Sequence, residues 1–269
     1  MFKQRLISGI ILVILALVFI IHGGYLLLAV LGIISLIGMY EFYRVFKVEK
    51  TVGIAGYIAA VLYYLNLAFG FLPDIMALIM GLLIVCMCFF VFGYPRFHAS
   101  QIIAAFFGFF YVAVMLSCIY LTRSLDGGRY LVWLIFLCSW GCDTCAYCVG
   151  MLFGKHKMSP KLSPKKSVEG AVGGVIGAAV LTLIYGFIFK GYMGEDVPYI
   201  FMMAGICAAG ALLSMVGDLA ASAIKRNYDI KDYGKLIPGH GGILDRFDSV
   251  IFTAPVIYFL SLYVICGLM

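Results

Sequence analysis

Charged residues are scarce in this sequence of 269 residues: Asp, Glu, Lys and Arg make up 12% of it, whereas 64% is hydrophobic. In a soluble domain about a quarter of the residues are charged, because the outer surface must face water. Too few polar residues are present here to cover such a surface. The composition therefore excludes an ordinary soluble protein and indicates that lipid surrounds most of the chain.

Several other features are missing. No cleavage site of small residues follows the basic start and the apolar residues 6–21, so we interpret this stretch as a retained first helix rather than a secretory signal. The basic residues form no patch interleaved with aromatic ones, and nucleic acid is not an expected partner. No repeat of fixed period is found either, which removes one sequence sign of a transporter.

Nine cysteines are an odd number, and most lie within apolar runs, which does not suggest a disulfide framework. Cys138, Cys142, Cys145 and Cys148 are three or four residues apart and would lie along one side of a helix. Metal binding is one interpretation of this spacing. We favour packing by small polarizable side chains, because such motifs normally bind metal from loops or helix ends.

Stretches of about 20 apolar residues, the length needed to cross a bilayer, predict about nine transmembrane helices. The fold class expected is therefore all-α, a polytopic integral membrane protein, with a tight turn at residues 22–24 joining the first two helices. The predicted spans lie near residues 6–21, 25–43, 52–72, 74–93, 101–121, 130–150, 170–190, 199–220 and 249–268.

The distribution of Lys and Arg predicts the orientation, since positively charged loops remain in the cytoplasm. With a cytoplasmic N-terminus, 16 of the 19 Lys and Arg residues lie on the cytoplasmic side; Arg123, Arg129 and Lys190 are the exceptions. We expect one membrane-embedded unit over 1–269, with N-terminal helices in 1–121 and catalytic helices in 122–269. Its polar material is concentrated in two cytoplasmic connections, 151–169 and 221–248.

Asp218 lies near the cytoplasmic end of the eighth predicted span. If the helix continues, Ser222 and either Lys225 or Arg226 share its face, because residues three or four apart are neighbours on a helix. An acid within a span costs about 2.5–3.5 kcal/mol, so it is expected to face a polar cavity and to have a partner. A purely structural Asp218–Lys225 ion pair is the alternative.

A glycine-rich segment follows, with glycines at 239, 241 and 242 after Pro238. Glycine lets backbone amides approach an anion closely, which is typical of a phosphate-binding loop. Asp245 and Asp248, three residues apart where the ninth helix begins, offer oxygen ligands to Mg²⁺, and Asp218 could add another. A helix cap with a solvated end is the alternative interpretation.

The second polar region begins inside the sixth span, where Asp143 and Tyr147 are expected to face the same way. Residues 163–167 are predicted to open the seventh helix, where Lys165 and Lys166 would favour an anion beside free helix amides. The alternatives are topogenic charge for the lysines and a buried hydrogen bond for Asp143. The glycines at 170, 173, 174 and 177 are expected to serve close helix packing. His156 is assigned no role.

These blocks resemble the signature of phosphatidate cytidylyltransferases, also called CDP-diacylglycerol synthases. The similarity runs without a gap from Ser222 to Asp248 and extends to the blocks around Asp143 and Glu169; two departures are Ser167, where Thr is frequent, and Val168, where an aromatic residue is frequent. The matching residues are Ser222-x-Ile224-Lys225-Arg226, Lys231-Asp232-x-Gly234, Ile237-Pro238-x-His240-Gly241-Gly242-Ile243 and Asp245-Arg246-Phe247-Asp248.

The resemblance implies that CTP and phosphatidate react to give CDP-diacylglycerol and pyrophosphate, with Mg²⁺ required and a second cation left open. The enzyme would lie in the cell membrane with its active site facing the cytoplasm, and a homodimer is an alternative to a monomer. Asp218 and Asp245, with Asp248, would hold the metal. Phosphates would be held by Lys225, Arg226, Arg246 and the loop at 238–242. The further substrate-binding candidates are Asp143, Tyr147, Lys165, Lys166, Ser222, Lys231, Asp232, His240, Gly241 and Gly242.

Two other functions remain open at this point. A CTP-dependent lipid kinase would use similar residues and differ in which phosphorus is attacked. An ion or solute transporter would also keep Asp143 and Asp218 within the membrane. It would not explain why residues 225–248 carry nine charged side chains.

Overall fold

The computed structural model describes residues 2–193, 196–239 and 241–265, with the side chains described from residue 8 to residue 263. Within these residues the fold is all-α apart from one short hairpin. Nine helical segments follow one another within the described residues: α1 (Phe2–His22), α2 (Gly24–Phe46), α3 (Gly53–Phe69), α4 (Ile75–Phe92), α5 (Ala99–Gly108) continuing through η1 (Phe109–Val114) into α6 (Met115–Arg123), α7 (Gly128–Phe136) continuing through η2 (Leu137–Gly141) into α8 (Cys142–Phe153), α9 (Val168–Met193), α10 (Val197–Asn227), and α11 (Leu244–Leu260) continuing into η3 (Ser261–Ile265).

The helices bear out an all-α polytopic membrane protein. Six of them are long and apolar enough to cross a membrane, namely α2, α4, α5 to α6, α7 to α8, α9 and α10, and α3 and residues Ser8–His22 of α1 form shorter apolar helices. Each of the nine predicted spans coincides with one helical segment of the described residues. The turn expected at residues 22–24 is also present, since α1 ends at His22 and α2 begins at Gly24.

Two compact units make up the described chain. One contains residues 1–120 and 232–246, and the other contains residues 121–231 and 247–269. The connection 221–248 therefore contributes to both units.

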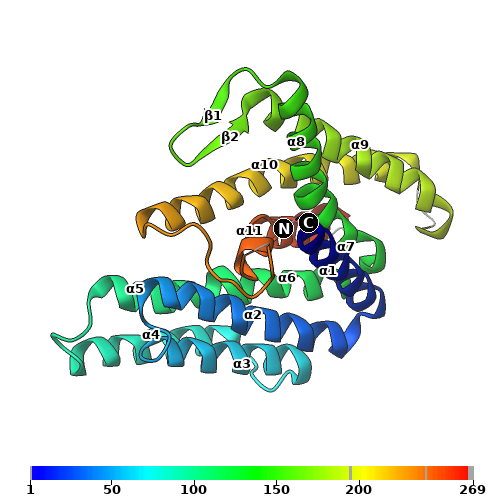
Figure 1. Cartoon of the computed structure of the whole chain (residues 1–269). Coiled ribbons are helices and arrows are strands. Elements are labelled where there is room, and N and C mark those ends of the chain that lie inside the picture. Colours follow the sequence, from blue (N-terminus) through cyan, green and yellow to red (C-terminus); the bar gives the residue numbers. More distant parts are fainter. Residues whose placement is uncertain (1, 194–195, 240, 266–269) are drawn as a thin grey trace. The chain divides into compact units, whose positions relative to one another are not determined.

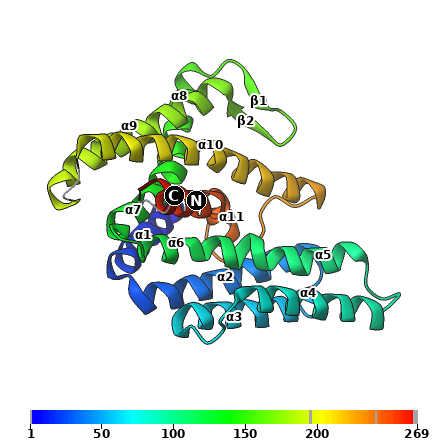
Figure 2. The same ribbon diagram turned by 180° about the vertical axis from the view of Figure 1, so that it is seen from behind.

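In the first unit, α2, α3, α4 and α5 lie side by side (Figures 1 and 2). Tyr43 of α2 is fully buried, and its hydroxyl donates a hydrogen bond to the Ala105 carbonyl at 2.6 Å. A side chain at Gly56 or Gly108 would collide with the Tyr43 ring, so these two glycines allow the helices to approach α2. This buried packing holds α2 in place, and α2 carries Glu41, which contacts the site described below.

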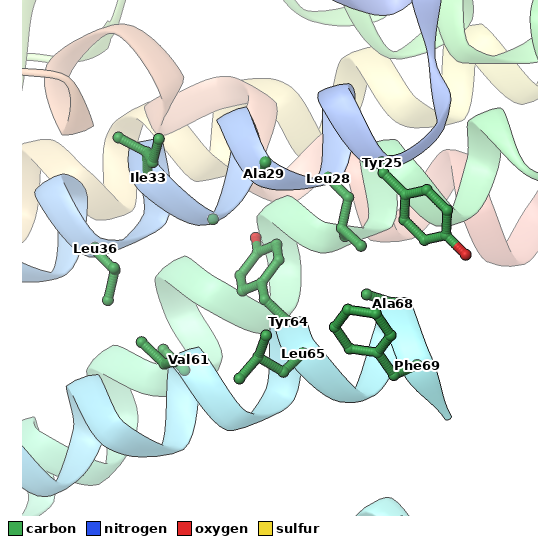
Figure 3. A pocket seen from close by; sticks show the side chains of 12 residues that line it. Tyr25, Leu28, Ala29, Ile33, Leu36, Val61, Tyr64, Leu65, Ala68 and Phe69 are labelled. Atoms are coloured by element: carbon green, nitrogen blue, oxygen red, sulfur yellow. The ribbon is translucent and has the colours of Figure 1, made fainter. Parts of the chain in front are cut away.

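An apolar groove lies between α2 and α3 in the same unit, with a volume of about 500 Å³. Figure 3 shows Leu28 and Ala29 of α2 on one side and Tyr64 and Leu65 of α3 on the other. The Tyr64 hydroxyl is 2.7 Å from the Ser35 hydroxyl, which satisfies both buried groups. The lining is apolar apart from tyrosine hydroxyls, so it suits hydrocarbon and offers no charged group to a phosphate.

In the second unit, α8 packs closely against α9. A Cβ at Gly173, Gly174 or Gly177 would lie 2.5–2.9 Å from side-chain atoms of Val149, Cys142 or Cys145, respectively. The predicted role of these glycines in helix packing is confirmed. Cys142 and Cys145 make these contacts too, which gives them the packing role we favoured.

The segment 163–167 corrects one prediction. It does not open a helix but forms strand β2 (Ser163–Ser167), which pairs antiparallel with β1 (Lys157–Ser159), and α9 begins only at Val168. Pro164 lacks a backbone N–H and is unfavourable inside a helix, whereas an edge strand tolerates it. Figure 2 shows this hairpin between the end of α8 and the start of α9.

Candidate active site

Asp218 and Lys166 form an ion pair in the second unit, where α10 meets strand β2. Both side chains are about three quarters buried, with 24% and 26% of their surface exposed, respectively. α10 continues to Asn227, so the prediction that Asp218, Ser222 and Lys225 share a helical face is supported. Lys166, which forms this ion pair with Asp218, comes from a strand that the sequence did not predict. A pairing of Asp218 with Lys225 stays a prediction.

Asp143 and Asp248 lie in the same unit and are linked through Ser249. The Ser249 hydroxyl donates to Oδ2 of Asp143 at 3.2 Å, and its backbone N–H donates to Oδ1 of Asp248 at 2.9 Å. A hydrogen bond is the alternative role that the sequence suggests for Asp143, and the structure contains such a bond. Tyr147, one turn further along α8, exposes 70% of its surface.

Asp248 stands in the first turns of α11, outside the six long apolar helices, and other carboxylates lie near it. Burial, followed by the nearby carboxylate of Asp218, raises the pKa of Asp248; Asp143 raises it further and Lys225 lowers it. Crowded carboxylates favour a proton or a cation between them. Gly217 allows this crowding, because a Cβ there would lie 2.9 Å from the Asp248 carbonyl oxygen.

The glycine-rich loop belongs to the first unit, and Asp245 holds its two ends. Oδ2 of Asp245 accepts hydrogen bonds from the backbone N–H groups of Tyr233 at 2.8 Å and Gly242 at 3.0 Å. This side chain is 5% exposed and stands in the first turn of α11, as expected. Asp245 therefore orders the loop.

Glu41 contacts the segment that follows this loop, and the sequence interpretation missed it. It lies within α2, only 3% exposed, and accepts hydrogen bonds from the backbone N–H groups of Ile243 at 3.1 Å and Leu244 at 2.8 Å. A side chain at Gly234 or Gly242 would collide with its carboxylate. The signal that could have found it is an acid inside an apolar span, which is costly unless partnered.

The remaining predicted residues are distributed over both units. Ser222 and Lys225 are half-buried on α10, and Gly241 has a positive φ of 86° in the loop. His240 lies outside the described residues. The exposed candidates are Lys165, Arg226, Lys231, Asp232 and Arg246.

The carboxylates of the site bear on whether it can hold a magnesium ion. Among the described residues, no group of three or more His, Cys, Asp or Glu side chains is arranged to hold a metal. Protein sites for Mg²⁺ usually supply one or two carboxylates and take the other ligands from water and substrate phosphates. Asp218 and Asp248 are two neighbouring carboxylates of the kind that such a site uses. In the described structure Lys166 balances the charge of Asp218.

Comparison with known proteins gives a consistent result. The family model described as the cytidylyltransferase family matches residues 3–264. The phosphatidate cytidylyltransferase of Bacillus subtilis is 31% identical over 270 residues, which covers 96% of this chain and 97% of that protein. The enzyme of the same name from Staphylococcus aureus is 31% identical over 261 residues, covering 95% and 97%. That of Rickettsia felis is 37% identical over 159 residues, covering 58% and 69%.

Proposed function

Because this chain belongs to the cytidylyltransferase family, we propose that it transfers the cytidylyl group of CTP to phosphatidate, giving CDP-diacylglycerol and pyrophosphate. One observation carries the proposal, namely similarity over nearly the full length of both chains to proteins named for this activity. The resemblance of residues 222–248 to the family signature supports it, since that segment holds Lys225, Asp245, Arg246 and Asp248 of the site.

The reaction joins two anions. A phosphate oxygen of phosphatidate attacks the α-phosphorus of CTP, a new P–O–P bond forms, and the bond to the β-phosphate breaks to release pyrophosphate. No side-chain nucleophile is needed, so the protein must align the two phosphates and balance their charge. Lys225, Arg226 and Arg246, together with the amides of the loop at 238–242, are proposed to hold phosphates. Lys165 and Lys166 serve the triphosphate or the lipid phosphate.

Asp218 and Asp248 would hold Mg²⁺, and Asp245 is proposed as a further ligand. When bound, the ion would supply positive charge to the reacting phosphates. Lys166 pairs with Asp218 in the described structure. We propose that its ammonium group turns to a phosphate when Asp218 holds the ion, so that positive charge stays within the site at every stage.

The substrates fix where such a site must lie. CTP is dissolved in the cytoplasm, whereas phosphatidate has its headgroup at the membrane surface. The two can meet only near the inner interface of the cell membrane, which agrees with the orientation expected from the basic loops. We therefore propose a multi-pass protein of the cell membrane whose active site faces the cytoplasm.

The position of an isotope in CTP tests this function. Purified protein in lipid vesicles would be incubated with phosphatidate, Mg²⁺ and CTP labelled at either the α- or the γ-phosphorus. We expect α-label in the chloroform-soluble lipid and γ-label in water-soluble pyrophosphate. Transfer of γ-label to lipid would identify a kinase instead. Uptake of solute into sealed vesicles without CTP, and no label in lipid, would identify a transporter.

A further inference from the structure

The base of the hairpin β1–β2 is held by a single carboxylate, that of Glu169. Its oxygens accept hydrogen bonds from the backbone N–H of Lys155 at 3.1 Å and from that of His156 at 3.2 Å. The His156 ring nitrogen Nδ1 lies 2.6 Å from Oε1. Glu169 stands in the first turn of α9, so one side chain joins the start of that helix to the chain entering the hairpin.

The second strand of the hairpin is fixed at the same base. Lys157 of β1 pairs with Ser167 of β2, and the Val168 N–H donates to the His156 carbonyl at 2.9 Å. The Ser167 hydroxyl accepts the Gly170 N–H at 3.1 Å, which caps α9. Lys166 immediately precedes Ser167 and forms the ion pair with Asp218. The position of Lys166 therefore depends on how the hairpin base is held.

We propose that Glu169 is a positioning residue, which holds the hairpin base so that Lys166 meets Asp218 and the substrate phosphates. This inference rests on the proposed function. The helix start favours a negative side chain, and two backbone amides bind it directly. His156 has 80% of its side chain exposed, so its contact with Glu169 alone contributes little in water. The hydrogen bonds from the two backbone N–H groups hold the hairpin base, and the contact with the His156 ring adds to them.

Glu169→Gln is the informative change. The amide has nearly the same size, but it has no charge and a single acceptor oxygen, so it cannot hold the contacts that the two carboxylate oxygens share. Glu169→Asp keeps the charge on a shorter side chain and should recover part of the loss. Lys161→Gln is the matched control, because it removes a charge from the exposed turn of the same hairpin, outside the contacts of Glu169.

The first measurement does not depend on activity. Hydrogen exchange of peptides covering residues 154–168 would be followed in wild type and variants. We expect about fivefold faster exchange in Glu169→Gln, because the side chain no longer holds both the Lys155 and the His156 backbone N–H groups. Lys161→Gln should match wild type. Unchanged exchange in Glu169→Gln would overturn the proposed role in holding the hairpin.

The second measurement is a double-mutant cycle on kcat/KM with Lys166→Gln. We expect Glu169→Gln to lower kcat/KM by about tenfold or more, since small misplacements of a site residue are costly. In the Lys166→Gln background the same change should have less than about a twofold effect, because coupled residues are not additive. If Glu169→Gln caused a general loss of folding, it would lower kcat/KM by the same factor in both backgrounds. That additive result would overturn the proposal.

The two proposals fail in different ways. Wild-type protein that transfers no α-label from CTP to lipid would overturn the function itself. Active wild type with a fully active Glu169→Gln variant would overturn the positioning role and leave the function in place.

Discussion

The carboxylate of Glu41 accepts the backbone N–H of Leu244 at 2.8 Å, although 203 residues separate them in the sequence. The same carboxylate accepts the N–H of Ile243. A buried acid inside an apolar helix thus orders the start of α11, which carries Asp245. The glycine-rich loop is therefore fixed by a residue on a helix of the N-terminal part of the chain.

We expect Glu41→Gln to reduce transferase activity while the protein still inserts and folds. The amide offers one acceptor oxygen in place of two, which leaves a buried N–H unsatisfied at a cost of about 1–3 kcal/mol. Activity and thermal unfolding in detergent would be measured together. Glu49→Gln, in the connection after α2, is the control. Full activity in Glu41→Gln would show that the loop does not need this carboxylate.

The sequence predicted the helices well but not the contacts between distant segments. Nine apolar stretches were visible because crossing a bilayer requires length and apolarity, properties that are local in sequence. The contact of Glu41 with residues 243 and 244 is not local, and the hairpin at 157–167 is too short and polar for a clear strand pattern. Lys166 was identified as a site residue, but its partner Asp218 became evident only from the structure.

Gly242→Ala should disable the loop for a steric reason. A Cβ at this position would collide with the Glu41 carboxylate, and Glu41 is fixed by its own hydrogen bonds. We expect a loss of activity of about tenfold or more, since a displaced loop misaligns its amides. Gly81→Ala in α4 is the matched control, because nothing lies within 4 Å of the added methyl group. Equal activity of the two variants would contradict this explanation.

Asp218→Asn and Asp245→Asn are expected to remove most Mg²⁺-dependent activity, by about a hundredfold or more, and to leave membrane insertion intact. An amide lacks the charge and is a poorer ligand for a hard cation. The Mg²⁺ dependence of the rate should be measured for each variant. Asp126→Asn, an exposed residue before α7, is the control. Near-normal turnover in either variant would exclude that aspartate as an essential metal ligand.

The orientation of the chain can be tested with a reporter that is active only outside the cytoplasm. Alkaline phosphatase fused after Met269 should be active, because a chain that starts in the cytoplasm and crosses the membrane the predicted nine times ends on the other side. The same enzyme inserted within residues 155–166 should be silent, since this hairpin carries five lysines and is expected to stay inside. The reverse pattern would place Lys166 and Asp218 on the face that CTP does not reach. The proposed reaction could not then occur at this ion pair, whatever the activity of the purified protein.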